Sequence, residues 1–265
     1  MEPQKESNGN LLEEMRDYKV VKSNDLIQRT RFILTTLEQK IILYLISKIK
    51  PDNFELEESE FKIREFYELC MKDGDNGANY RYIKHTLKNL RDKSIWFKLP
   101  NGSETTLAWF SRVTMNENNG TVKIKFDDIM KPHLLQLKEQ FTQFSIRYIL
   151  AMKSLYSIRL YELLKSYESM KEWTYEVQEL KQKLFAETYI RYPDFRRKVI
   201  DIAVREINNY GDISVQYTVE KNGNKVTHIN FQIKTRTDIM ERVNVWTNIE
   251  SALENGKKKS CDNAE

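Results

Sequence analysis

A short basic run, RYPDFRRK, is the part of this sequence best suited to binding a charged partner. It contains the cations Arg191, Arg196, Arg197 and Lys198 and one acid. Arginine reads guanine through two parallel hydrogen bonds in the major groove, and a helix N-terminus favours phosphate. Cations at that end oppose the helix dipole, so the cluster is easier to explain if a polyanion binds there. A solvated charged face is the alternative; we favour DNA binding.

Two further basic groups could contact the phosphates of DNA. One is a stripe on a helix predicted over residues 79–93, formed by Arg81, Lys84, Lys88 and Arg91. The other is the pair Lys221 and Lys225, which flank an Asn-Gly turn. Ordinary exposure to solvent explains both groups about as well as binding does.

Residue patterns that support catalysis are missing from the sequence. The three histidines, His85, His133 and His228, are far apart and form no HxH or HExxH spacing, and Cys70 and Cys261 form no CxxC pair. There is no GxxxxGK[ST], GxGxxG or GxSxG motif. We therefore predict no metal, no cofactor and no enzymatic activity. A tyrosine nucleophile remains formally open, because the chain has 14 tyrosines.

The length of 265 residues predicts two domains, at about 150 residues each. Lys and Arg number 43 against 39 Asp and Glu, a net charge of +4, so the positions of the cations matter more than their total. No run is apolar enough for a membrane span, and the polar, acidic start is unlike a signal peptide. Two cysteines suit a reducing cytoplasm, where we expect the protein to be.

The first half of the chain predicts helices followed by strands. TTLE places Thr35 and Glu38 as a capping box before a helix with an apolar stripe. A short FKI strand, a helix over REFYELCM and the helix over 79–93 follow. The pattern then alternates with period two through SIWFKL, TTLAWFSRVTM and TVKIKF, three predicted strands joined by Asn/Gly turns. The aromatic residues of these strands are predicted to form sheet core: Trp96, Phe97, Trp109 and Phe110.

The second half repeats this order. Residues 134–170 predict two helices with a break near 141–145, followed by a helix over EVQELKQKLF and a turn. The next helix begins near Pro193, and its predicted buried face comprises Phe195, Val199, Ile202 and Ala203. ISVQYTVE and VTHINFQIK alternate around Gly223, the strongest hairpin signal in the chain.

Helices followed by a hairpin, occurring twice, predict an α+β fold of two tandem winged-helix domains. The expected boundaries are a flexible segment over 1–19, a first domain over 20–132, a second over 133–236, and a flexible tail over 237–265.

Three blocks in the right order resemble the iteron-binding plasmid replication initiators. These are KPHLLQLKEQFTQFSIRYILAMKSLYSIRLYELLKSY, PDFRRKVIDIAVREIN and ISVQYTVEKNGNKVTHINFQI, and VVKSNDLIQRTRFILTTLEQKIILYLISKI is similar to the start of the family's first domain. The resemblance runs from about Val20 to Lys234. One departure is the turn after LKQKLF, where relatives often have Gly and this chain has Ala186 and Glu187; it bears on how the third helix is aimed.

The resemblance implies two pseudo-symmetric winged-helix domains that bind direct repeats of double-stranded DNA in a plasmid origin. The second domain would read the sequence, with Arg196 and Arg197 at base-reading positions. The first would contact DNA and carry a dimer interface. Monomers would open the origin and recruit the host initiator ATPase and replicative helicase, while homodimers would repress the protein's own promoter.

Two other functions compete with this one. A dedicated winged-helix transcriptional repressor would share the fold, and a rolling-circle nicking enzyme would need the HxH ligands that the sequence lacks. We also hypothesise that dimers form through apolar strand edges within residues 94–126, which a charge at Phe110 would disrupt.

Overall fold

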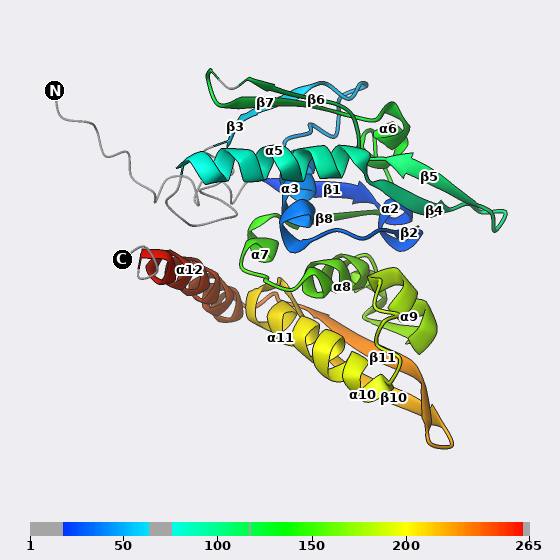
Figure 1. The fold of residues 1–265 in the computed structure, drawn as a ribbon. Coiled ribbons are helices and arrows are strands. Elements are labelled where there is room, and N and C mark those ends of the chain that lie inside the picture. Colours follow the sequence, from blue (N-terminus) through cyan, green and yellow to red (C-terminus); the bar gives the residue numbers. More distant parts are fainter. Residues whose placement is uncertain (1–17, 64–75, 117, 262–265) are drawn as a thin grey trace.

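The computed structural model describes residues 18–63, 76–116 and 118–261 (Figure 1). The helix expected over REFYELCM and most of the segment expected to be flexible over 1–19 lie outside these residues. The first described strand, β1 (Lys19–Ser23), precedes α2 (Asn24–Gln28) and β2 (Thr30–Arg31).

The helix α3 (Thr36–Ser47) opens the first winged helix and begins at the predicted capping box. The Thr35 hydroxyl accepts a hydrogen bond from the Glu38 amide at 3.2 Å, and the Glu38 carboxylate accepts one from the Thr35 amide at 2.7 Å. Lys93, just after α5 (Asn76–Asp92), donates to the same buried carboxylate. One acid therefore caps α3 and ties it to the end of α5.

Two three-stranded sheets complete this half. One has the order β2-β4-β5 and the other β3-β7-β6. Their strands are β3 (Ser59–Lys62), β4 (Ser94–Lys98), β5 (Glu104–Ala108), β6 (Phe110–Asn116) and β7 (Thr121–Phe126). The prediction of one continuous strand over TTLAWFSRVTM is therefore wrong, because this segment forms β5 and β6, which belong to different sheets. The segment divides at Trp109, which is buried against Phe32 while the chain crosses from one sheet to the other.

The predicted aromatic core is confirmed at three of four positions. Phe97, Trp109 and Phe110 are buried, whereas Trp96 is 43% exposed beside the Arg31 guanidinium. Phe110 has no exposed surface and packs on Phe126, so a charge at this position would disrupt the core rather than a free strand edge. The segment SIWFKL is not an edge, because β4 is the middle strand of its sheet, whereas β5 and β6 are outer strands. A dimer interface on these outer strands stays a prediction.

The segment between the two halves differs from its prediction. The expected break over 141–145 is a strand, β8 (Phe141–Ser145), which pairs antiparallel with β1. Gln136 and Gln140 have φ angles of 53° and 51°, so the backbone before β8 is not helical. The short helices α6 (Lys131–Leu134) and α7 (Arg147–Leu150) lie on either side.

The second half has the predicted order of helices followed by a hairpin, with one strand, β9, that the sequence pattern did not predict. Its elements are α8 (Leu155–Lys165), β9 (Glu172–Glu176), α9 (Val177–Leu184), α10 (Tyr192–Phe195), α11 (Asp201–Tyr210), β10 (Ile213–Asn222) and β11 (Lys225–Thr235). The strands form one sheet of order β10-β11-β9. Figure 1 shows α11 in front of the β10–β11 hairpin, which extends beyond the helix as a wing.

The flexible tail expected after residue 237 is instead a helix, α12 (Ile239–Cys261). Val245 and Ile249 are one helical turn apart and buried, and the Arg147 guanidinium donates to the Glu250 carboxylate at 2.6 Å. These contacts dock α12 against α7 and α11. Residues four apart lie on one face of a helix, so Val245 and Ile249 can be buried together. None of the helices within the described ranges is long and apolar enough to cross a membrane.

A buried ionic cluster joins the two halves. Lys22 on β1 pairs with Glu162 on α8, and Arg159 lies 3.9 Å from the same carboxylate. Arg159 also donates to the carbonyl oxygens of Ile27 and Thr30, each at 2.7 Å. All three charged side chains are at least 96% buried. Each charge therefore depends on its neighbours in the cluster for compensation, and the cluster holds α8 to the first half.

Candidate nucleic-acid interface

The predicted DNA-reading helix is continuous from α10 through α11, but its middle turn is not α-helical. Residues Arg196–Ile200 form a π turn, in which the Asp201 amide donates to the carbonyl of Arg196. Phe195, Val199 and Ala203 are buried as predicted. Ile202 is only half-buried and Ile200 is buried instead, because the wider turn rotates the residues that follow it.

Arg196 points toward the wing rather than straight into solvent. Its Nε donates to the Tyr217 hydroxyl on β10 at 3.1 Å and lies 3.5 Å from an Asp201 carboxylate oxygen. The Tyr217 hydroxyl donates to the other oxygen of Asp201 at 2.5 Å. The Arg196 side chain is still 57% exposed, so it is fixed at one nitrogen and accessible beyond it.

Arg191, Arg197 and Lys198 are all exposed around the first turns of the same helix. The Arg197 side chain is 74% exposed and forms a long 3.4 Å contact with Asp194. The Lys198 ammonium lies 5.7 Å from the ring centre of Tyr189. The four predicted cations therefore share one end of the helix, and Arg196 is held by contacts with both the wing and its own helix.

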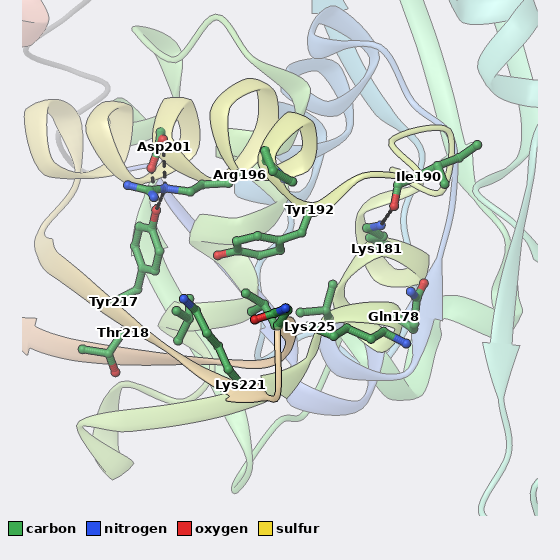
Figure 2. A pocket seen from close by; sticks show the side chains of 15 residues that line it. Gln178, Lys181, Ile190, Tyr192, Arg196, Asp201, Tyr217, Thr218, Lys221 and Lys225 are labelled. Atoms are coloured by element: carbon green, nitrogen blue, oxygen red, sulfur yellow. Dashed lines mark hydrogen bonds and ion pairs between the residues drawn. The ribbon is translucent and has the colours of Figure 1, made fainter.

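A groove of about 940 Å³ lies between this helix, the start of α9 and the wing. Figure 2 shows Arg196, Tyr192, Lys221 and Lys225 around it. Lys221 and Lys225 stand on either side of the two-residue turn at Gly223, where φ is +58°. The hairpin prediction is confirmed, and it brings the two wing lysines to the same groove as Arg196.

The turn before the helix is held by a buried lysine. Phe185 ends α9 in the left-handed region at φ 50°, the place where a glycine would be least strained. Lys181 is buried and donates to the Ile190 carbonyl at 3.1 Å, and burial lowers the pKa of its amine. Ala186 itself has no positive φ angle and its side chain is buried, so the turn needs no glycine at that position.

Ile190 is an apolar residue left at the rim of the groove. An apolar residue just before a helix cap usually packs on the fourth helical residue, here the buried Phe195. Ile190 is instead 88% exposed. Figure 2 shows its side chain directed outward, away from the groove, and its carbonyl directed toward Lys181.

The first winged helix offers a second basic face. The predicted stripe on α5 is exposed throughout, while Ile83, Leu87 and Leu90 on the opposite side are buried. Its exposed members are Arg81, Lys84, Lys88 and Arg91. The Arg91 Nε also donates to the Ser111 carbonyl at 3.3 Å. In Figure 1, α5 and the α10–α11 helix lie on the near side of the molecule.

Sequence reasoning missed four residues of the site: Lys181, Ile190, Asp201 and Tyr217. Ile190 could have been noticed from the sequence, because it is an isolated apolar residue between a predicted turn and a basic run. The contacts of Tyr217 with Asp201 and Arg196 join the hairpin to the helix and depend on the π turn, so no local pattern indicated them. Across the residues with described positions, no three His, Cys, Asp or Glu side chains converge as metal ligands would.

Comparison with known proteins identifies the family. Residues 19–165 match the family model described as "Initiator Replication protein, WH1", and residues 176–233 match "Initiator Rep protein, WH2". The chain belongs to this family of replication initiators. The predicted family and the two winged-helix domains are thereby confirmed. The first model continues through α8, beyond the boundary expected at residue 132.

The chain is also similar to two individual proteins of Escherichia coli. The PI protein of Escherichia coli is 32% identical over 145 residues, which cover 48% of this chain and 48% of that relative, about half of its length. An uncharacterized 27.6 kDa protein of Escherichia coli is 24% identical over 227 residues, covering 77% of this chain and 91% of that protein.

A solved structure also matches this replication initiator. It is the crystal structure of the Pi initiator protein in complex with iteron DNA, with a TM-score of 0.66 and 22% identity over 84% of this chain and 99% of that one. At this identity the match supports the fold.

Proposed function

We propose that this initiator starts plasmid replication by binding direct repeats, or iterons, in the origin. The α10–α11 helix of the second winged helix would read the base sequence, and the wing would contact the DNA backbone. The observation that carries this proposal is the groove itself, where Arg196, Lys221 and Lys225 converge from two elements of one winged helix. Family membership and the iteron DNA bound by the Pi initiator support it.

The arrangement of the two helices supports binding by a monomer. Because α5 and the α10–α11 helix lie on the same side, one chain could reach two successive major-groove faces, about 34–36 Å apart along DNA. An isologous dimer has two-fold symmetry and suits an inverted site instead. We therefore propose that monomers act at the origin and homodimers repress the promoter.

Recruitment of the host initiator ATPase and replicative helicase is part of the same proposal. It rests on the family resemblance, and no surface of the chain is assigned to either partner. The proposed role requires no catalysis by this chain, which would open the origin through binding alone.

Substitutions test the division of labour within the groove. Arg196→Ala or Arg197→Ala should each weaken specific binding by about 1–3 kcal/mol and relax preference at one or two base pairs. Lys221→Ala should weaken all sequences alike and reduce the dependence of log Kd on log salt by about one. Gel-shift titrations on repeat and scrambled duplexes at several salt concentrations measure both effects. If the arginine variants keep full specific binding, the assignment of the reading helix fails.

A further inference from the structure

We propose that Asp201 and Tyr217 are positioning residues that hold Arg196 in the orientation needed to read a base, an inference that rests on the proposed function. Neither residue need touch DNA. Their role follows from the π turn, from their contacts with Arg196 and from the chemistry of a carboxylate in a DNA-binding groove.

The π turn is what allows Arg196 and Asp201 to meet. In an α-helix with about 3.6 residues per turn, residues five apart point about 140° away from each other. The hydrogen bond from the Asp201 amide to the Arg196 carbonyl spans five residues and brings both side chains to nearly the same face. A regular helix of the same sequence would direct Asp201 elsewhere, and π turns of this kind are frequent at functional sites.

Tyr217 completes a closed set of contacts across two elements. It accepts a hydrogen bond from Arg196 and donates one to Asp201, so the hydroxyl links the helix to strand β10 of the wing (Figure 2). Burial and the bond to Asp201 raise the pKa of Tyr217 to about 12, which keeps its proton in place. The hydrogen bond to Tyr217 and the charge of Asp201 also raise the pKa of Arg196.

Only the Nε of Arg196 takes part in these contacts. Its two terminal nitrogens therefore remain able to donate to a base, while the contacts at Nε fix the plane of the guanidinium. A fixed fork loses less conformational freedom when it forms two hydrogen bonds with guanine. The same restraint makes it harder for Arg196 to turn toward a phosphate when the base is wrong.

The carboxylate of Asp201 gives this arrangement a measurable signature. A negative charge in a groove that binds a polyanion weakens binding to every DNA sequence. It therefore lowers affinity while the orientation that it imposes raises discrimination, a trade common in specific binders. Removing the charge should affect these two quantities in opposite directions.

The test uses the full chain and two duplexes of equal length, one carrying the direct repeat found beside the gene and one with that repeat scrambled. Discrimination is the Kd for the scrambled duplex divided by the Kd for the repeat duplex. Asp201→Asn should bind the scrambled duplex more tightly and lower this ratio roughly tenfold. Tyr217→Phe should lower the ratio without any change of charge. Glu172→Gln is the matched control, because it removes one exposed acid from strand β9, outside the groove, and should leave the ratio unchanged.

A background lacking Arg196 separates positioning from a general structural effect. If Asp201 acts through Arg196, then Asp201→Asn should cause no further loss of discrimination when combined with Arg196→Ala. Additive losses would overturn the proposal, as would an unchanged ratio in both Asp201→Asn and Tyr217→Phe. A wild-type protein that binds both duplexes equally would refute the proposed function itself, and the inference with it.

Discussion

Replacing Glu162 with Gln should strongly destabilise the protein, because this residue neutralises a buried lysine between the two halves. The exposed fractions of the side chains of Lys22 and Glu162 are only 2% and 3%. Burial lowers the pKa of Lys22, and the charge of Glu162 opposes that shift. Without the carboxylate, the Lys22 ammonium would have to lose its proton inside the protein or draw water into the core.

The size of the effect follows from the burial. Removing one partner of a buried ion pair costs about 3–5 kcal/mol, because the other charge is left uncompensated. For a chain of this size, each kcal/mol lowers the Tm by about 2–4 °C. We therefore expect the Tm of Glu162→Gln to fall by about 6–20 °C. The bonds from one Arg159 nitrogen to the Ile27 and Thr30 carbonyls remain, but the Arg159 charge, 3.9 Å from the same carboxylate, also loses its buried counter-charge.

A second substitution tests the reason for this loss. Lys22→Met together with Glu162→Gln removes the Lys22 charge and leaves only Arg159 without its counter-charge, so the double variant should recover part of the lost stability. The control is Glu58→Gln, which breaks the exposed pair with Arg112 and should cost less than about 1 kcal/mol. Urea unfolding followed by circular dichroism measures all three. The explanation is wrong if Glu162→Gln costs no more than Glu58→Gln, or if the double variant is less stable than the single one.

Three further predictions concern stability. Leu163→Ala should lower the free energy of unfolding by about 2–5 kcal/mol, since Leu163 is fully buried in α8, and a stable variant that had lost DNA binding would contradict this. Burial lowers the pKa of His133 below its usual 6.5, against the charge of Asp25, so the unfolded chain takes up the proton first. The contribution of neutral His133 to the free energy of unfolding should therefore be fully present above pH 6.5 and decline below it. His133→Gln should reduce the dependence of the urea midpoint on pH in this range. Ile190→Ser should leave the Tm within about 1 °C of wild type, because its exposed side chain supports no packing, and a larger drop would show a hidden contact.

Local signals in the sequence predicted the parts of the fold that depend on neighbouring residues. The capping box at Thr35 and the hairpin around Gly223 are confirmed because caps and tight turns use residues close together in the chain. The buried faces of α5 and of the α10–α11 helix were also largely readable, since apolar residues recur at helical spacing.

The errors arose where distant segments decide the structure. Strand β8 forms because β1, more than 100 residues earlier in the chain, supplies its hydrogen-bond partners. The break at Trp109 depends on which of two sheets receives each part of the strand. Helix α12 has a polar, charged sequence, and the side chains of α7 and α11 that cover Val245 and Ile249 lie far away in sequence.

The candidate site shows the same division. The basic residues of the helix and the wing could be selected from type and position alone. The π turn could not, because no residue pattern in RYPDFRRKVID distinguishes it from an ordinary helix. The orientation of Arg196 therefore became visible only once the helix and β10 were placed together.

Footprinting of the full chain on the DNA that flanks its own gene tests the central claim most directly. The proposed function predicts that a monomer protects each direct repeat over two successive major-groove faces, about one helical turn apart. It also predicts that Arg196→Ala abolishes the protection on one of these faces first. Protection confined to an inverted repeat, with the direct repeats left open, would contradict the account and identify the protein as a repressor.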